Sequence, residues 1–249
     1  EFVKQMTSNL PERPPYFSFD VGVNLRGAPP MNTLSAVRAL TEREFKEAAS
    51  SGAVVIDTRP APFFGAGHFP KSINIGINSP MFSTWVGFMV PAGKPILLVV
   101  GSADSVPKAR LELARIGYDR IDGFIVADDL KETRQTSQLS VCDLKTAVRT
   151  SKAPFILDVR TPGEWSSAHI DGAKHIPLPQ LPKKMAELPK DQSIAVICGS
   201  GYRSSIGGSL LESAGFQRLQ NVMGGMGAYS ETRCEELRPA DLVFSNNPK

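Results

Sequence analysis

The amino-acid sequence predicts an α/β protein made of two consecutive domains, each a parallel sheet flanked by helices. Three observations lead to this prediction. Short apolar runs alternate with helical segments, which is typical of parallel sheets. The same order of motifs occurs twice along the chain. The 249 residues are enough for two domains of ordinary size.

Residues 1–33 are rich in proline, which interrupts regular structure, so we expect an irregular connector there. Residues 34–130 are expected to form the first domain. A helix should begin after Thr41, because Thr41 and Glu44 have the spacing of a capping box. The other elements expected in this domain are strands at 54–56, 73–75 and 96–100 and a helix that ends before Gly117.

Residues 131–139 are polar and are expected to link the domains, and residues 140–249 should form the second domain. Its expected elements are a helix at 144–148, strands at 155–157 and 194–197, and a helix from about Ser204 that ends before Gly215. Three pairs of residues stand 101 positions apart: Asp57 and Asp158, Arg59 and Arg160, His68 and His169. This constant spacing indicates an internal repeat.

The stretch VICGSGYRSS, residues 196–205, carries the most chemical information. A buried strand ends in Cys198, a turn with Gly199 and Gly201 follows, and a helix then begins. The two glycines permit positive φ angles, so that successive backbone N–H groups can surround one atom. The positive end of the helix dipole points at the same place. These surroundings favour the thiolate form of a cysteine, which is its nucleophilic form.

Cys198 and Arg203 are therefore the candidate catalytic residues, with Arg203 supplying a permanent positive charge at the mouth of the turn. The candidate substrate-binding residues lie in the same stretch or at the end of a neighbouring strand: Gly199, Ser200, Gly201, Tyr202, Ser204 and Arg160. Further along the chain, Gly224 and Gly225 are expected to let another backbone segment approach this turn closely.

The first copy differs from the second at the positions that carry the chemistry. With an offset of 98 residues, Cys198, Gly201, Tyr202 and Arg203 correspond in the first copy to Val100, Ala103, Asp104 and Ser105. The first copy thus lacks the nucleophile and the cation, and it places a carboxylate beside the would-be anion site. We expect the first domain to be catalytically inactive.

Residues present in both copies are more typical of architecture than of chemistry. Asp158 and His169 could act as an acid–base pair for Cys198, or they could satisfy backbone groups where a strand meets its loop. We favour the structural interpretation, because the inactive copy retains both residues. Arg160 remains a candidate ligand residue, because ligands usually bind at the carboxyl ends of parallel strands.

The loop C-x-x-G-x-R, followed by SSIGGSLLESAGF and NVMGG, resembles the active-site signature of rhodaneses. The resemblance covers nearly all of residues 34–249 and implies two consecutive rhodanese-like domains. It implies a sulfurtransferase that moves sulfane sulfur from thiosulfate or a low-molecular-weight persulfide to a thiophilic acceptor through a Cys198 persulfide, without a cofactor. The segment LPERPPYFSFDVGVNLRGAP resembles the connector after the metallo-β-lactamase-fold domain of persulfide dioxygenase–rhodanese fusions. Such a dioxygenase domain is therefore a candidate partner.

Two other functions remain open. Rhodanese-fold phosphatases and arsenate reductases hold a tetrahedral oxyanion in a longer loop, Cys-x5-Arg. Only four residues separate Cys198 from Arg203, which suits a single sulfur atom better. The other alternative is a non-catalytic sulfur-relay or docking module for a persulfide dioxygenase.

The composition excludes several classes of partner. A net charge of +3 without a Lys/Arg run does not indicate nucleic acid, and no apolar stretch or signal peptide indicates a membrane. A His-x-His-x-Asp-His cluster does not occur, so no metal is expected. The three cysteines, an odd number far apart, do not indicate disulfides. Cys142 and Cys234 are expected to be packing residues in a protein of the reducing cytoplasm, whose partners are small-molecule sulfur donors and acceptors.

Overall fold

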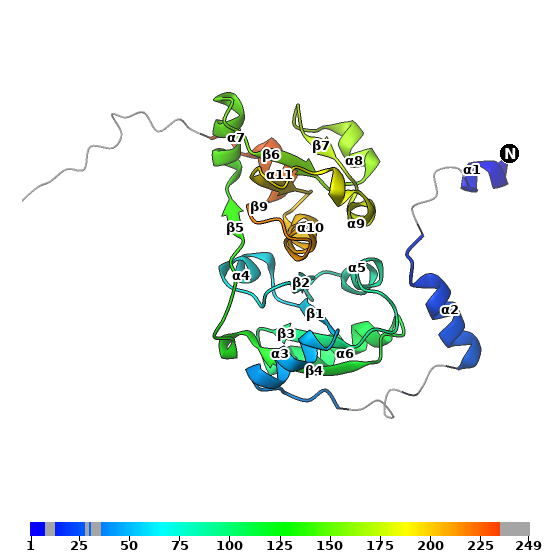
Figure 1. Ribbon diagram of the computed structural model, residues 1–249. Coiled ribbons are helices and arrows are strands. Elements are labelled where there is room, and N and C mark those ends of the chain that lie inside the picture. Colours follow the sequence, from blue (N-terminus) through cyan, green and yellow to red (C-terminus); the bar gives the residue numbers. More distant parts are fainter. Residues whose placement is uncertain (8–12, 28–29, 31–35, 235–249) are drawn as a thin grey trace, which may run out of the picture.

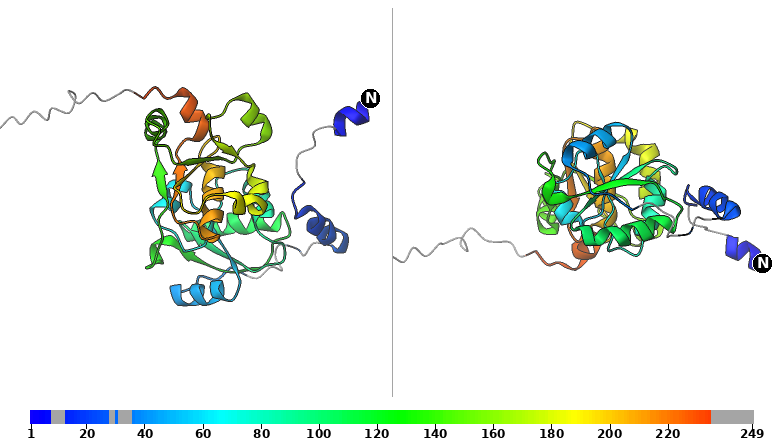
Figure 2. Two further views of the ribbon diagram at one scale, coloured as in Figure 1. Left: turned by 45° about the horizontal axis from the view of Figure 1, so that its top comes forward. Right: turned by 90° about the horizontal axis from the view of Figure 1, so that it is seen from below.

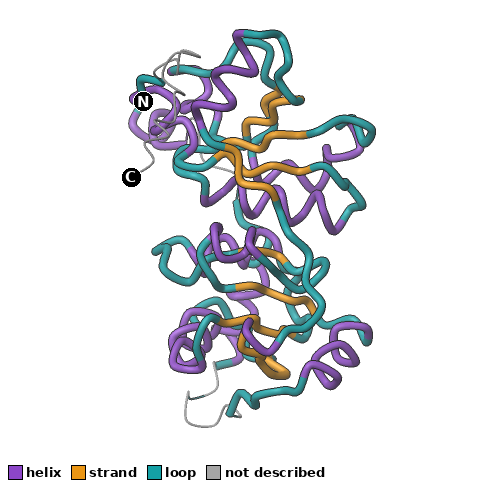
Figure 3. The backbone as a smooth tube through the Cα atoms, turned by 90° about the vertical axis from the view of Figure 1, so that its left-hand side faces the viewer, coloured by secondary structure: helices purple, strands orange, loops and turns teal. Residues whose placement is uncertain are grey.

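The computed structural model describes residues 1–7, 13–27, 30 and 36–234. Two parallel sheets lie in separate halves of the molecule, and helices flank each sheet (Figures 1 and 3). Helix α10 (Tyr202–Ser213) belongs to the second half and lies between the two sheets (Figure 1). The predicted α/β class with two parallel sheets is confirmed.

The first half contains a four-stranded sheet in the order β2-β1-β3-β4. Its strands are β1 (Val54–Asp57), β2 (Ile73–Asn74), β3 (Ile96–Val100) and β4 (Ile121–Val126). Its helices are α3 (Glu42–Ser50), α4 (Ala61–Ala66), α5 (Phe82–Met89) and α6 (Val106–Ala114). The predicted capping box is present at the start of α3, where the Thr41 side chain accepts the Glu44 backbone N–H at 3.3 Å.

The second half contains a five-stranded sheet in the order β5-β9-β8-β6-β7. Its strands are β5 (Ser137–Leu139), β6 (Phe155–Asp158), β7 (Lys174–His175), β8 (Ile194–Ile197) and β9 (Leu219–Val222). Besides α10, its helices are α7 (Val141–Arg149), α8 (Pro162–Ser167), α9 (Leu181–Lys184) and α11 (Gly225–Glu231). Strand β5 takes up the last part of the predicted linker 131–139, because the open edge of β9 offers backbone groups for pairing.

The two halves resemble each other in sheet topology. Read from β4 and from β9, the two sheets have the same strand order, and β5 adds one further edge strand to the second. The register of the central strands also agrees, as shown by two pairs: Asp57 with Val99, and Asp158 with Ile197. Val100, the last residue of β3, therefore has the position that Cys198 has in the second half, as the offset of 98 residues requires.

One hydrophobic core is shared by the two halves. Successive residues of a strand point to opposite faces of its sheet, so that alternate residues of β3 enter this core and the others pack on the outer face. Helix α10 contributes Ile206 and Leu211, neither of which is exposed to solvent. Most residues of α10 are buried, which is expected for a helix with packed elements on more than one side.

The expectation that residues 1–33 are irregular is wrong for two segments. Helices α1 (Phe2–Thr7) and α2 (Phe17–Arg26) form there, because neither segment contains a proline: three prolines lie between the two helices and two follow α2. The Tyr16 ring packs so closely on Gly87 of α5 that a Cβ there would lie 2.0 Å from the ring. Helix α1 has no buried residue and lies away from the main body (Figure 2). Residues 8–12, 28–29 and 31–33 of this expected connector lie outside the described residues.

The expectation about the cysteines is also wrong. Cys142 in α7 and Cys234, after α11, form a disulfide that closes a loop of 92 residues, and Cys198 is the free cysteine. Helices α7 and α11 pack against each other, which brings the two distant residues together. Counting cysteines by sequence distance could not reveal this pairing, because only the tertiary packing of α7 and α11 produces it.

Candidate active site

Cys198 lies directly after the buried strand β8, and its side chain is surrounded by the turn that leads into α10. The Gly201 backbone N–H donates a hydrogen bond to Cys198 Sγ at 3.2 Å. Gly201 is the N-cap of α10 and has a φ of +95°, so a residue with a side chain would be strained at this position. The thiol therefore lies at the positive end of a twelve-residue helix, with a backbone donor aimed at it.

Gly199 does not need a positive φ angle, contrary to the sequence expectation; in this turn only Gly201 has one. The reason is that one left-handed residue is enough to turn the chain from the strand into the helix. Gly199 instead leaves room for a neighbour, since a Cβ there would lie 3.2 Å from the Arg203 guanidinium. Ser200, the next residue, is exposed.

A second segment of backbone holds the turn from outside, as Gly224 and Gly225 predict. The Met226 N–H donates to the Cys198 carbonyl at 2.7 Å, and the Gly227 N–H donates to the Gly199 carbonyl at 3.0 Å. Gly225 has a φ of +57°, and a Cβ there would lie 2.3 Å from the Cys198 carbonyl oxygen. The predicted close approach is confirmed.

Arg203 forms a two-pronged ion pair with Glu164 in the first turn of α8. Its two terminal nitrogens donate to the two carboxylate oxygens at 2.7 and 2.5 Å. This hydrogen bonding lowers the pKa of Glu164 to about 2. It also raises the pKa of Arg203, against a smaller lowering by burial. Glu164 is a site residue that the sequence analysis missed. A comparison of the two halves could have revealed it, because the first half has the exposed Phe63 at the corresponding position.

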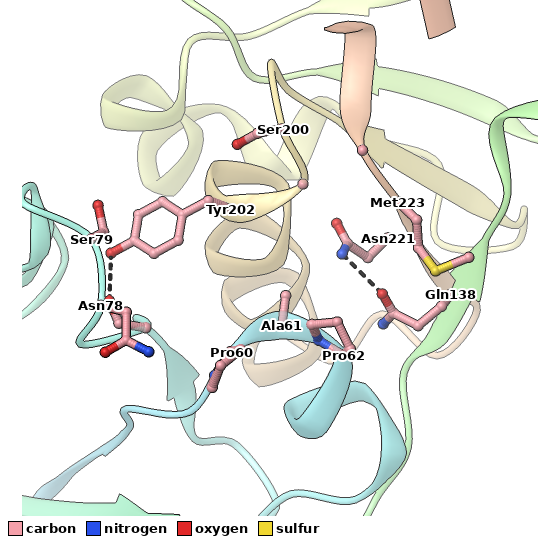
Figure 4. Close-up of a pocket in the computed structure, with 13 residues that line it drawn as sticks. Pro60, Ala61, Pro62, Asn78, Ser79, Gln138, Ser200, Tyr202, Asn221 and Met223 are labelled. Carbon is pink, nitrogen blue, oxygen red and sulfur yellow. Dashed lines mark hydrogen bonds between the residues drawn. The ribbon is translucent and has the colours of Figure 1, made fainter. Parts of the chain in front are cut away.

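A buried polar chain connects Cys198 to the far edge of the sheet. Ser204 Oγ lies 3.5 Å from Cys198 Sγ and donates to Asn221 Oδ1 at 2.6 Å. Asn221 Nδ2 in turn donates to Gln138 Oε1 at 3.1 Å (Figure 4). Asn221 was also missed. The strand pairing places Phe124 at the equivalent position of the first sheet, so a comparison of the two copies could have revealed it.

The Asp-x-Arg pair has the same structural contacts in both halves. The Arg160 side chain donates to both oxygens of Asp158 and to the Ala168 carbonyl, at distances from 2.6 to 3.0 Å. Arg59 makes the corresponding bonds to Asp57 and to the Gly67 carbonyl. These contacts occupy the Arg160 guanidinium, which is buried, in joining a strand to its loop. A role of Arg160 in substrate binding stays a prediction.

The repeated histidines share two contacts, although His68 is buried and also lies 2.9 Å from Glu212 Oε2 whereas His169 is exposed. The His68 ring stacks on Phe64 with centroids 3.8 Å apart, and the His169 ring stacks on Trp165 at 3.9 Å. In each case Nδ1 hydrogen bonds the carbonyl of the aromatic residue, at 2.9 and 3.0 Å. The His175 ring also stacks on Trp165, and its Nε2 donates to the Arg160 carbonyl. These contacts agree with the structural interpretation of the histidines.

A cleft of about 520 Å³ lies between the two halves, beside the turn (Figure 4). The second half contributes Gln138, Ser200, Gly201, Tyr202, Asn221, Met223 and Gly224 to its lining, and the first half contributes Pro60, Ala61, Pro62, Gly76, Asn78 and Ser79. The Tyr202 hydroxyl crosses the boundary and donates to the Gly76 carbonyl at 3.2 Å. Burial raises the pKa of Tyr202 to about 12, against a smaller lowering by Ser79.

The described residues contain no group of three or more His, Cys, Asp or Glu side chains placed to hold a metal ion. Among the helices of the described segments, none combines the length and the apolar character needed to cross a membrane.

Comparison with known proteins identifies the family. Residues 140–232 match the rhodanese-like domain family. The sulfurtransferase of Allochromatium vinosum is 35% identical over 76 residues, which are 30% of this chain and 71% of that protein. The putative sulfurtransferase YtwF of Bacillus subtilis is 34% identical over 95 residues, which are 38% of this chain and 91% of that protein. The chain therefore belongs to the rhodanese-like family.

Other relatives are matched over a smaller part of their length. The probable adenylyltransferase/sulfurtransferase MoeZ of Mycobacterium tuberculosis is 30% identical over 131 residues, which are 52% of this chain and 32% of that protein. The chain spans about half the length of the putative sulfur carrier protein YrkF of Bacillus subtilis. Among solved structures, a rhodanese-like domain protein from Staphylococcus aureus is 31% identical, with a TM-score of 0.37. The match covers 40% of this chain and 97% of that protein's chain.

Proposed function

We propose that the protein is a sulfurtransferase that works through a persulfide on Cys198, with thiosulfate or a low-molecular-weight persulfide as the donor. The observation that carries the proposal is the position of Cys198 Sγ at the N-terminus of α10, within hydrogen-bond distance of the Gly201 N–H. The rhodanese-like match over residues 140–232 and the names of the relatives support sulfur transfer in general.

The reaction has two half-reactions. In the first, the Cys198 thiolate attacks the outer sulfur of the donor, and the sulfur–sulfur bond of the donor breaks. Sulfite or a thiolate leaves with the electron pair, and a Cys198 persulfide remains. In the second, an acceptor such as cyanide, a thiol or sulfite attacks the terminal sulfur. The bond from Sγ to that sulfur breaks, and Cys198 returns to the thiolate.

The residues around Cys198 would stabilise the anionic sulfur in both steps. The N–H groups of the turn and the end of the α10 dipole are fixed before the reaction, so they need little reorganisation. Arg203 would hold the donor anion, with its guanidinium oriented by Glu164. Gly199, Ser200, Gly201, Tyr202 and Ser204 remain the proposed binding residues, and the cleft beside them would admit donor and acceptor.

We further propose that the first half is a catalytically inactive rhodanese-like domain, since it repeats the strand order but has Val100 in place of the cysteine. The domain boundaries proposed for the two copies are 34–130 and 140–249. A persulfide dioxygenase domain as partner rests on the resemblance of the N-terminal segment alone. A cytoplasmic location stays a prediction, and the disulfide removes the cysteine count as an argument for it.

The test is the mass of the protein after treatment with thiosulfate. We expect the protein to become one sulfur atom heavier, with peptide mapping placing that sulfur on Cys198, and to lose it on addition of cyanide. Cys198→Ser should neither gain sulfur nor turn over thiosulfate with cyanide. Sulfur bound elsewhere, or hydrolysis of aryl phosphates that depends on Cys198 and exceeds sulfur transfer, would overturn the proposal.

A further inference from the structure

Helix α10 begins beside Cys198, but side chains along its whole length contact the first half. Tyr202 reaches the Gly76 carbonyl, and Ser213 Oγ donates to the Lys71 carbonyl at 3.1 Å. Between these two, Ser205 and Ser209 both meet Asn74 of β2. The helix that carries the proposed anion site is thus fastened along its length to the half that lacks the nucleophile.

Asn74 makes the most extensive of these contacts. It is 2% exposed, and Ser205 Oγ donates to its Oδ1 at 2.5 Å. Its backbone N–H donates to Ser209 Oγ at 3.0 Å, one turn further along α10. Its Nδ2 donates to the carbonyls of Asp57 and Arg59 at 3.2 and 2.9 Å. The amide is therefore held in one orientation, with its oxygen directed at the first turn of α10.

The second half shows that the sheet itself does not require this residue. His175 pairs with Asp158 in the register in which Asn74 pairs with Asp57. Its Nε2 binds the Arg160 carbonyl, which is the contact that Asn74 Nδ2 makes with the Arg59 carbonyl. The hydrogen bond from Asn74 to α10 is therefore an addition to a shared strand contact, and it joins β2 to the catalytic helix.

We propose that Asn74 is a positioning residue, which acts through Ser205 to set the first turn of α10 and so the Gly201 N–H that faces Cys198. Ser205 is next to Ser204, which contacts Cys198 Sγ, and the Ser205 N–H donates to the Gly201 carbonyl at 3.3 Å. A change at Ser205 therefore passes directly to the turn around the thiol. The proposal rests on the proposed function, because it assigns the first half a part in the same site.

The experiment compares Asn74→Ala and Ser205→Ala with the control Ser213→Ala, which removes a contact between the halves at the other end of α10. One readout is the thiolate absorbance of Cys198 near neutral pH, measured as the difference from Cys198→Ser. The other is the rate of sulfur loading from thiosulfate, separated into kcat and KM. We expect both test variants to lose most of the thiolate absorbance and about tenfold in kcat, with KM little changed. The control should match the wild type.

Ser205→Ala leaves the bonds from Asn74 to the Asp57 and Arg59 carbonyls in place, so it decides the question if Asn74→Ala does not fold. The proposal is overturned if the wild type has no thiolate absorbance, if both variants keep the wild-type values, or if the control loses as much as they do. If the wild type has the thiolate absorbance and the test variants lack it, but the wild type transfers no sulfur, the proposed function alone is overturned.

Discussion

Replacing Gly225 by alanine should disable the turn around Cys198 while leaving its chemical groups in place. The added Cβ would lie 2.3 Å from the Cys198 carbonyl oxygen, 2.6 Å from the Gly199 carbonyl carbon and 2.7 Å from the Ser200 nitrogen. All three are backbone atoms, so no flexible side chain can move aside. Restoring ordinary contact requires the turn and α11 to separate by about 1 Å, and a displacement of that size can cost about a hundredfold in rate.

The stability cost has two parts. An alanine with a φ of +57° costs about 1–2 kcal/mol, and forcing the backbone apart adds about 1–3 kcal/mol. Gly215→Ala is the matched control, because Gly215 has a φ of +92° and nothing lies within 4 Å of the added Cβ. Gly215→Ala should therefore lose stability from the positive φ angle alone, without a steric clash. Denaturant unfolding and thiosulfate:cyanide turnover measure the two effects. A Gly225→Ala protein with kcat/KM close to that of Gly215→Ala would refute the reasoning.

Two further predictions concern the disulfide and the ion pair. Changing Cys142 and Cys234 together to serine should lower the free energy of unfolding by about 2–4 kcal/mol, because the bond closes a long loop, and should leave sulfur loading of Cys198 intact. A loss of loading at equal folded fraction would contradict this. Because the pKa of Glu164 is about 2, below its ordinary value of 4.5, its stabilising effect is present above about pH 4.5 and disappears as the pH falls through 2. The partly exposed pair with Arg203 stabilises the fold by about 1 kcal/mol or less. Between about pH 5 and pH 2, the wild type should therefore lose that much more stability than Glu164→Gln. Equal losses of the two proteins in denaturant titrations would contradict this prediction.

The fold was predictable because its signals are local. Runs such as Ile96–Val100 are apolar at every position, which a strand buried on both faces requires, and the Thr41 capping box marks a helix start within four residues. The turn at Cys198 was predictable for the same reason. Gly201 is needed for a positive φ angle, and its position three residues after the cysteine places its N–H on Sγ.

The parts that could not be predicted depend on contacts between distant segments. Glu164 lies 39 residues from Arg203, and nothing in either local sequence announces their pairing. The disulfide depends on the packing of α7 against α11, and the contact of Asn74 with α10 spans 131 residues. The helices near the N-terminus were missed for another reason: proline breaks a helix only where it stands, and α1 precedes Pro11 while α2 lies between Pro15 and Pro29.

The two copies show why a cysteine alone would not make the first half resemble the second. Around Cys198, Arg203 is paired with Glu164, and Ser204, which lies 3.5 Å from the thiol sulfur, donates to Asn221. The first half has no counterpart to either pair: the corresponding residues are Ser105 with Phe63, and Val106 with Phe124. The buried Ser204–Asn221 pair needs both members, because a buried polar group left without its partner costs about 1–3 kcal/mol. A cysteine at position 100 would therefore lack the polar neighbours of Cys198, while the strand order and the Asp-x-Arg contacts, which serve the sheet, persist in both halves.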